Sequence, residues 1–251
     1  MQAISFEIGG KFGFFHWGKT KGDRRVTNIF ISRTEVLGIL GAIVGLDGYS
    51  QRNFRVKNKS DIKETFYESL GGLNVSIIPK QVPSFFTDHL IHRSMKHINL
   101  KGSLMVEMEG LVEPSYKIVL SQGLVDNKTF EKVMMYLKRG WAEYIPYFGK
   151  NGFPVEISNV KEEQLLNLEE NQEYVVDSLY KQSNVNKMPK VLKSKLINLE
   201  NNDYHYSENL KDFCEEEPPK IINKQTIWSS FKVTLNSKVY ETEEKEKIVF
   251  L

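Results

Sequence analysis

One segment, residues 31–48, constrains the fold more than any other part of the chain. Every residue from position 36 to position 46 is aliphatic or glycine, so no face of the segment suits water and we expect a buried helix. Ser32 and Glu35 have the spacing of a capping box, in which two side chains bond the free N–H groups of a helix start. Because its apolar run, residues 36–46, is shorter than the roughly 18 residues of a membrane span, the segment is predicted to pack against a sheet.

Three glycines interrupt this helix. Gly38, Gly41 and Gly45 each lower helix stability by about 1 kcal/mol relative to alanine, but they remove bulk where another backbone must approach closely. Arg33 lies at the start of the helix, where free N–H groups and the helix dipole favour an anion. The helix and the basic loop before it therefore suggest a phosphate ligand.

The charges are divided unevenly along the chain. Of its 251 residues 40% are hydrophobic, which is enough to form a core. The formal net charge is +2, but residues 1–150 contain 21 Lys and Arg against 14 Asp and Glu, whereas residues 151–251 contain 13 against 18. This division favours a first part that faces a polyanion, although chance scatter of surface charge would also produce it.

Cysteine usage and the start of the chain limit the class of protein. The single cysteine, Cys214, excludes an internal disulfide and a zinc site built from thiolates, and we expect no metal and no cofactor. Met1 leads directly into an alternating strand pattern, with no signal peptide and no apolar run long enough to span a bilayer. We therefore expect a cytoplasmic protein that does not bind membranes.

Hydrophobic periodicity predicts an α+β succession of strand, helix, strand, strand, helix and strand, which is typical of a ferredoxin-like split βαβ unit. The expected elements are strands at 3–8, 73–78 and 116–120, helices at 31–48, 60–71 and 126–140, and a last strand between 141 and 157. After Pro154 the pattern changes. There we expect an acidic helix at 161–170, strands at 231–235 and 247–251, and a β-rich second half.

Residues 81–107 have no periodicity that fits a compact core. They fit either an extended arm or a hairpin. Three of the five histidines of the chain lie in this stretch, and they are accompanied by basic residues. The group comprises His89, His92, Arg93, Lys96 and His97.

The connection at residues 9–33 alternates basic and aromatic residues, and its cations include Lys19, Lys21, Arg24 and Arg25. Single-stranded nucleic acid requires this combination, because cations bind its phosphates and rings stack on its bases. The alternative is that the rings belong to the core and the lysines to an ordinary surface. For the charges as a group we favour nucleic-acid binding. Farther along, Lys150 lies at the tip of a glycine-bearing turn, which alone is a weak phosphate signal.

Several of these motifs together resemble one known family. The segments "SRTEVLGILGAIVGLDG", "EPSYKIVL" and "YFGKNGFPVEI", which follow a first strand and a basic aromatic loop, are similar to the Cas-five family. This family supplies a subunit of type I CRISPR surveillance (Cascade) complexes, and the pattern looks most like its I-B branch. The resemblance covers residues 4–157 with gaps and leaves the last hundred residues unmatched.

The resemblance implies a ferredoxin-like domain of the repeat-associated RNA-binding superfamily at residues 1–157. It also implies a β-hairpin thumb at about 81–107. For residues 158–251, which the resemblance does not cover, the residue patterns predict a β-rich region packed on the domain. Relatives of this kind hold the 5′ handle of the CRISPR RNA, contact the backbone and large subunits of the complex, and act in antiviral defence. Contact between the thumb and target DNA is left open. The expected RNA-binding residues are Lys19, Lys21, Arg24, Arg25, Arg33, Thr34, His92, Arg93, Lys96 and Lys150.

Two other functions are left open. A relative in the I-C branch cleaves precursor RNA, and metal-free cleavage needs a general base, a general acid and a cation. His97, Lys96 and Tyr49 would supply these groups, but spacing alone is a poor indicator of a catalytic site, so we expect RNA binding without catalysis. The other alternative is a purely architectural subunit that contacts only protein.

Overall fold

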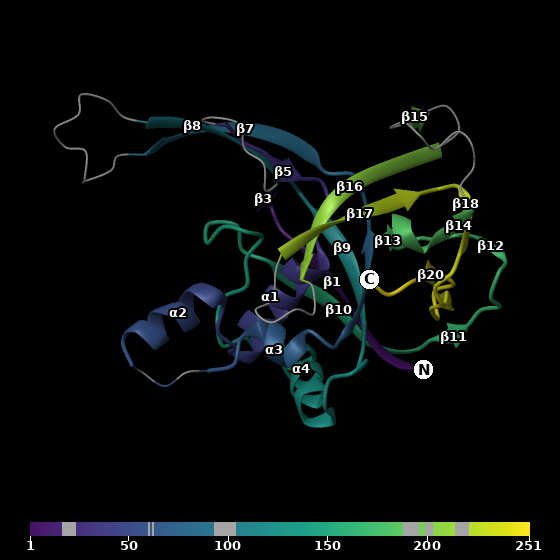
Figure 1. Cartoon of the computed structure of the whole chain (residues 1–251), viewed down its shortest axis with the longest axis horizontal. Helices are drawn as coiled ribbons and strands as arrows, with labels where there is room; N and C mark the ends of the chain where they lie inside the picture. The colour runs from purple at the N-terminus through teal and green to yellow at the C-terminus, as the bar shows by residue number, and fades with distance from the viewer. Residues whose placement is uncertain are drawn as a thin grey trace.

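The computed structural model describes residues 1–16, 24–59, 61, 63–92, 104–187, 196–198, 203–213 and 221–251. Its central sheet has four strands in the order β10-β1-β9-β6, and every neighbouring pair is antiparallel. These strands are β1 (Gln2–Gly9), β6 (Asn74–Pro79), β9 (Ser115–Ser121) and β10 (Glu156–Gln164). Helix α1 (Arg33–Val44) connects β1 to β6, and α4 (Asn127–Arg139) connects β9 to β10. The predicted succession of six elements is therefore present (Figure 1).

The two helices cover one face of this sheet. Alternate residues of β1, among them Ile4 and Phe6, are buried in the same cluster as Leu37 and Leu40 of α1 and Val133 of α4. A strand places successive side chains on opposite faces, so the residues between them lie on the other face. The main core therefore fills the space between the sheet and the helices.

Helix α1 forms as its sequence predicts. Ser32 and Glu35 make the capping box, with a 2.7 Å bond from the Ser32 N–H to Glu35 Oε2. Gly45 ends the helix with a φ of 82°, a conformation that favours glycine. A methyl group at Gly41 would overlap Phe66 of α3 (Phe66–Leu70), so the predicted close approach is confirmed at this glycine.

The segment after α1 differs from the prediction. Helix α2 (Tyr49–Lys57) was not expected, because its residues are polar and lack apolar periodicity. The helix expected at 60–71 is reduced to α3. The reason is a second capping box, in which Thr65 N–H donates 2.8 Å to Glu68 Oε2 and so sets the start of α3 six residues later than expected. Residues 60 and 62 lie outside the described part of the chain.

The last strand of the sheet also lies later than expected. Strand β10 begins at Glu156, so most of the interval 141–157 is loop, and β10 passes through the predicted boundary at residue 157. The acidic helix expected at 161–170 is wrong, because this segment completes β10 and forms β11 (Leu166–Asn167). Its carboxylates pair with cations of neighbouring elements, among them Glu163 with Lys117. This pairing explains why a strand can contain so many acidic residues.

Strands β7 (Ser84–His92) and β8 (Leu104–Val112) form the hairpin that the stretch at 81–107 suggested. They pair antiparallel from Ser84 opposite Val112 to His92 opposite Leu104, and the hairpin projects away from the body (Figure 1). Short strands of the first loop join its base. These are β2 (Phe12–Gly13) and β4 (Arg24–Arg25), which pair with β8, and β3 (Phe15–His16) and β5 (Thr27–Asn28), which pair with each other.

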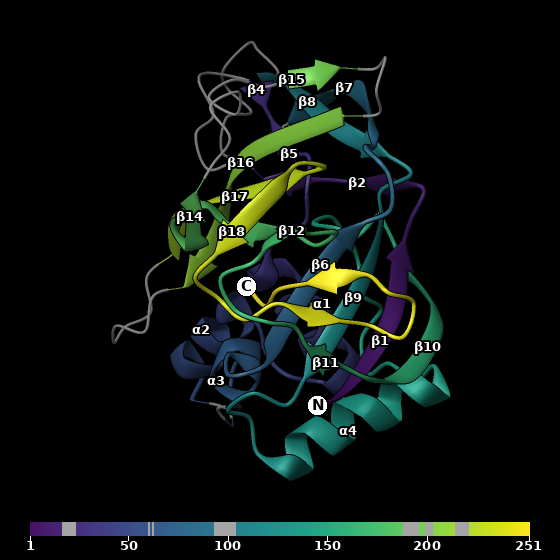
Figure 2. The ribbon, with the colours of Figure 1, turned by 90° about the vertical axis from the view of Figure 1, so that its right-hand side faces the viewer.

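The described part of the second half is β-rich, as expected. Its strands are β11, β12 (Glu173–Val175), β13 (Tyr180–Lys181), β14 (Val185–Lys187), β15 (Leu196–Asn198), β16 (Asp203–Phe213), β17 (Ile221–Ser229), β18 (Lys232–Leu235), β19 (Tyr240–Glu241) and β20 (Lys247–Ile248). Its last strands cover the sheet face opposite the helices (Figure 2), where Ile248 packs with Ala3 and Val119. Among the described helices, none has the length and apolar character needed to cross a membrane.

One buried cation ties this region to the sheet. The ammonium group of Lys117 on β9, 6% exposed, donates 2.9 Å to Glu244 and 2.7 Å to Glu246. It also lies 3.4 Å from Glu163 of β10. These three carboxylates of the second half therefore pair with a cation of the central sheet and not with the basic first loop.

Candidate nucleic-acid interface

Four basic side chains from distant parts of the sequence meet where the first loop joins the hairpin. We call His16, Arg25, Lys150 and Lys211 the cationic cluster. They come from β3, β4, the turn before β10, and β16. Their charges influence one another: Lys211 and Arg25 both lower the pKa of His16, after a larger lowering by partial burial.

Lys150 belongs to the cluster because its turn is fixed against the first loop. Gly149 has a φ of 74°, and a side chain there would overlap the carbonyl of Phe14. Phe14 N–H donates 3.1 Å to the carbonyl of Phe148, and Lys150 Nζ lies 5.5 Å from the centre of the Phe14 ring. Burial and then Arg25 lower the pKa of Lys150, while Asp88 of the hairpin raises it.

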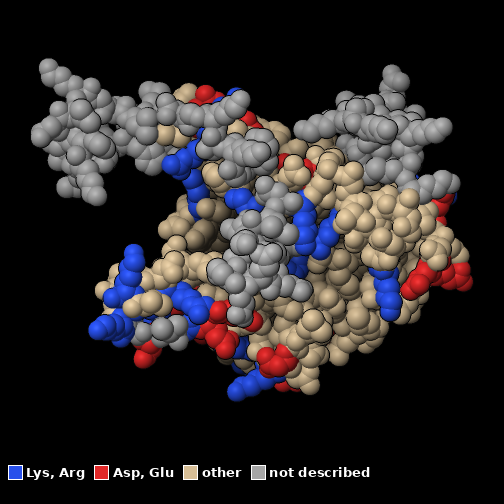
Figure 3. Space-filling view, viewed as in Figure 1, with Lys and Arg blue, Asp and Glu red and all other residues tan. Residues whose placement is uncertain are grey.

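After the larger effect of burial, Arg25 lowers the pKa of both His16 and Lys150, so the cluster holds like charges close together. Among the described residues, no ion pair joins Arg25, Lys150 or Lys211 to a carboxylate. An anion that approached them would relieve the repulsion. Figure 3 shows a hollow between the hairpin and α2, with Lys and Arg side chains on both sides of it.

Arg24 and Arg33, two predicted RNA-binding residues, make bonds within the protein. The guanidinium of Arg24 lies 3.2 Å from Glu107 and from Glu109 on β8, although its side chain is 55% exposed. Arg33 donates to the carbonyl of Gly71 and, at 3.0 Å, to that of Leu73. Both arginines therefore hold elements of the fold together.

The start of α1 offers less to a phosphate than the sequence suggested. The carboxylate of Glu35 already lies there, where it bonds the N–H and the hydroxyl of Ser32 at 2.7 Å. Burial raises the pKa of Glu35, and the bonds from Ser32 and the charge of Lys211 lower it. A second anion at this position would meet a carboxylate, so the argument from the helix dipole does not hold here.

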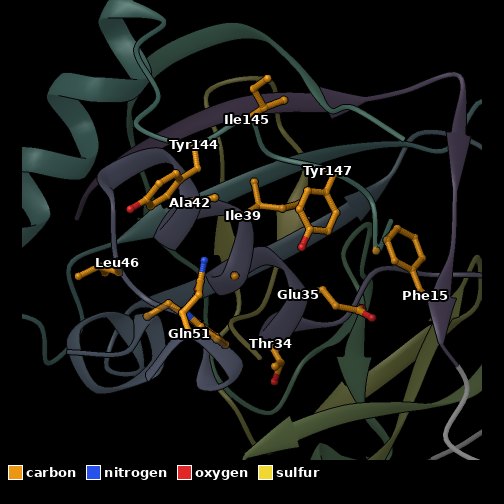
Figure 4. A pocket seen from close by; sticks show the side chains of 14 residues that line it. Phe15, Thr34, Glu35, Ile39, Ala42, Leu46, Gln51, Tyr144, Ile145 and Tyr147 are labelled. Atoms are coloured by element: carbon orange, nitrogen blue, oxygen red, sulfur yellow. The ribbon is translucent and has the colours of Figure 1, made fainter. Parts of the chain in front are cut away.

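An apolar cavity of about 340 Å³ lies beside the cluster, between α1, the start of α2 and the segment that precedes Lys150 (Figure 4). Phe15, Ile39 and Tyr147 supply much of its wall. Nothing would contact a methyl group at Gly38, so the missing side chain keeps the cavity open. Thr34, a predicted site residue, lines it, and the Thr34 hydroxyl is buried without a hydrogen-bond partner in the described part of the chain.

Tyr49, one of the three residues that the nuclease alternative would use, begins α2. Its ring meets Phe66 edge-on with centroids 5.9 Å apart. Burial raises the pKa of Tyr49, and a bond with Thr65 lowers it. A phenol with a raised pKa is a poor general base at neutral pH.

The remaining predicted site residues are only partly described. The backbone of His92 ends β7, but its side chain lies outside the described part, as do Lys19, Lys21, Arg93, Lys96 and His97. Sequence reasoning did not select His16 or Lys211. His16 stood within the basic aromatic loop, which could have marked it, whereas nothing near Lys211 indicated a site. Among the described residues, no three His, Cys, Asp or Glu side chains are grouped as metal ligands.

These observations define a mixed α/β fold with a protruding hairpin and a cationic surface at its base. No family model and no curated protein matches the chain. Two solved structures share its fold. One is titled a CRISPR RNA-guided surveillance complex, with 11% identity over 93% of this chain and 91% of the other and a TM-score of 0.51. The second is a CRISPR protein from Archaeoglobus fulgidus. The match has 12% identity, covers 100% of this chain and 99% of the other, and has a TM-score of 0.50. At such low identity the likeness concerns the fold, which is similar to that of CRISPR-associated proteins.

Proposed function

We propose that the chain is a non-catalytic, RNA-binding subunit of a type I CRISPR surveillance complex, which holds the 5′ handle of the CRISPR RNA in the cytoplasm. The observation that carries the proposal is the cationic cluster, because Arg25, Lys150 and Lys211 form no ion pair with a described carboxylate and are therefore suited to a polyanion. The apolar cavity beside it supports a single-stranded ligand, whose unpaired bases need rings to stack on.

The finer assignment is to the Cas-five family, branch I-B, with a ferredoxin-like first domain. The strand order β10-β1-β9-β6, with α1 and α4 as the two crossovers, supports the ferredoxin-like class. The projecting hairpin corresponds to the thumb that the resemblance implies. In such a complex the remaining surfaces would contact the backbone and large subunits.

The mechanism is positional. Arg25, Lys150 and Lys211 neutralise phosphates of the handle, and each such contact makes the affinity fall with salt. A base that leaves the stack enters the apolar cavity, where the exposed ring of Tyr147 contributes about 1–3 kcal/mol by stacking. The protein thereby fixes one end of the guide without breaking a covalent bond.

Replacement of the cluster tests the proposal. In the triple variant Arg25→Ala, Lys150→Ala, Lys211→Ala, we expect binding of handle RNA to weaken and the slope of log affinity against log salt to fall by up to about three. The matched control is Lys128→Ala with Lys232→Ala, two exposed lysines on other surfaces. Unchanged affinity and slope in the triple variant would contradict the proposal.

Cleavage by the isolated protein is the test of the nuclease alternative. Incubation with repeat RNA in EDTA should leave the RNA intact. A discrete cut that disappears in His97→Ala would show that the protein is a metal-independent endoribonuclease. If the purified complex instead carries no RNA on this subunit, the architectural alternative is correct.

A further inference from the structure

A second cavity, of about 310 Å³, lies at the base of the hairpin, on β5, the two hairpin strands and β16. In Figures 1 and 2 these elements lie together above the central sheet. Its lining differs from that of the first cavity, because it combines an aromatic ring with several hydrogen-bond acceptors. Neither the proposed phosphate contacts nor the apolar cavity uses it.

Asn28 of β5 is the most informative residue of this lining. The residue is 1% exposed, and its side-chain oxygen has no hydrogen-bond partner in the described part of the chain. A buried acceptor without a partner costs free energy. A ligand that donates a hydrogen bond within the cavity would recover that cost.

The hairpin supplies the other two groups. Phe85 of β7, opposite Leu111, is 47% exposed, so its ring offers a free surface. Glu109 of β8, opposite Thr87, lies two residues from Leu111 and therefore shares the face of Phe85. One oxygen of Glu109 accepts a 3.2 Å bond from Arg24, which fixes the carboxylate and offsets its charge.

We propose that this cavity recognises an unpaired RNA base that carries an exocyclic amino group. Phe85 provides the stacking surface, and Glu109 and Asn28 accept hydrogen bonds from the base edge. The inference rests on the proposed function, since it assigns a further contact with the same RNA. A neutral base fits better than a cationic side chain of a protein partner, because Arg24 already pairs with Glu109 and Arg25 lies next along β4.

Two pairs of RNA oligonucleotides, differing in amino groups, test the proposal. Oligocytidine differs from oligouridine at the base edge, where cytosine presents an amino group and uracil a carbonyl oxygen. Guanosine-containing oligouridine differs from the inosine-containing form by the 2-amino group alone. For both pairs we expect the amino-bearing RNA to bind about tenfold tighter to the full chain.

Variants assign the preference to the cavity. Glu109→Gln replaces one acceptor oxygen with a donor and should abolish the preference. It also leaves Arg24 paired with Glu107 alone, which strengthens phosphate binding to every RNA, so the ratio of affinities is the readout. Asn28→Ala should reduce the ratio, and Phe85→Ala should weaken both members of a pair about equally. Glu131→Gln, on the exposed face of α4, is the matched control and should change neither.

The outcomes separate this inference from the proposed function. If all RNAs bind in a salt-dependent manner but show no preference, or if Glu109→Gln preserves the preference, the base site is wrong and handle binding stands. If no RNA binds, the proposed function itself fails. Binding of an oligoarginine peptide that Glu109→Gln abolishes, without any base preference, would assign the cavity to a cationic protein partner and overturn the inference.

Discussion

The ammonium group of Lys117 shows how a single buried charge can hold two parts of a chain together. Glu244 and Glu246 come from the last hairpin, and Glu163 comes from the edge strand of the sheet. A buried ion pair is weak evidence of net stability, but removal of one partner leaves the others uncompensated. The interaction is therefore best judged by what its loss does.

Replacement of Lys117 with methionine should lower the free energy of unfolding by about 3–5 kcal/mol, because Glu163 remains buried without its cation. Urea unfolding measures the change. Lys161→Met is the matched control, since Lys161 bonds the same Glu244 from a side chain that is 56% exposed, and its loss should cost less than about 1 kcal/mol. Equal effects of the two substitutions would contradict the structural role of Lys117.

His16 gives the cationic cluster a pH dependence. Partial burial, Lys211 and Arg25 lower its pKa, so in the free protein the imidazole is neutral at neutral pH. A phosphate beside it would raise that pKa, and RNA binding would then take up a proton. We expect RNA affinity to rise as pH falls from neutral, and His16→Gln to flatten this rise. Titrations of RNA binding at several pH values would show it, and the same profile in both proteins would exclude His16 from the interface.

At the scale of elements, sequence reasoning succeeded where both halves of a signal lie close together. The capping pair of α1 is only three residues apart, and the periodicity of α4 is contained in the helix itself. Helix α2 was missed because none of its residues is buried, so it carries no apolar stripe. Strand β10 was misplaced because its charged residues find their partners on other elements, and such partners are invisible in a linear pattern.

Gly41 and Gly38 offer a matched test of helix packing. Alanine at Gly41 would overlap Phe66, so we expect Gly41→Ala to destabilise the protein by about 1–3 kcal/mol. Alanine at Gly38 would meet nothing within 4 Å and should stabilise the helix by about 0.5–1 kcal/mol. Thermal unfolding of both variants decides the matter. If Gly41→Ala is as stable as Gly38→Ala, the close approach of α3 is not a constraint.

At the scale of the whole molecule, the candidate site could not be read from the sequence. Its basic side chains come from positions 16, 25, 150 and 211, and only the fold brings them together. The basic loop and the Lys150 turn were each recognisable, and the hairpin followed from its lack of core periodicity. Strand β16 brings Lys211 to the cluster only because of how the second half packs on the first, and no local sequence pattern predicts that packing.

Attachment of the second half should also depend on pH. Lys161 and Lys117 lower the pKa of Glu244 from 4.5 to about 2. A lowered carboxyl pKa stabilises the fold above the unfolded value, and this contribution is lost as pH falls toward the folded value. We therefore expect the stability difference between the natural protein and Glu244→Gln to shrink from about pH 4.5 to about pH 2. Urea unfolding across this range measures it, and a constant difference would contradict the ion pair.

The parallel pairing of β4 with β8 has a mechanical consequence. Arg25 lies opposite Met108 in this pairing, so a displacement of the hairpin would carry Arg25 with it. A tilt of the arm caused by a neighbour at its outer end would displace Arg25 relative to Lys150. Contact at the outer end of the hairpin would then change the affinity of the cationic cluster for nucleic acid, and nucleic acid bound at the cluster would change the affinity of that contact.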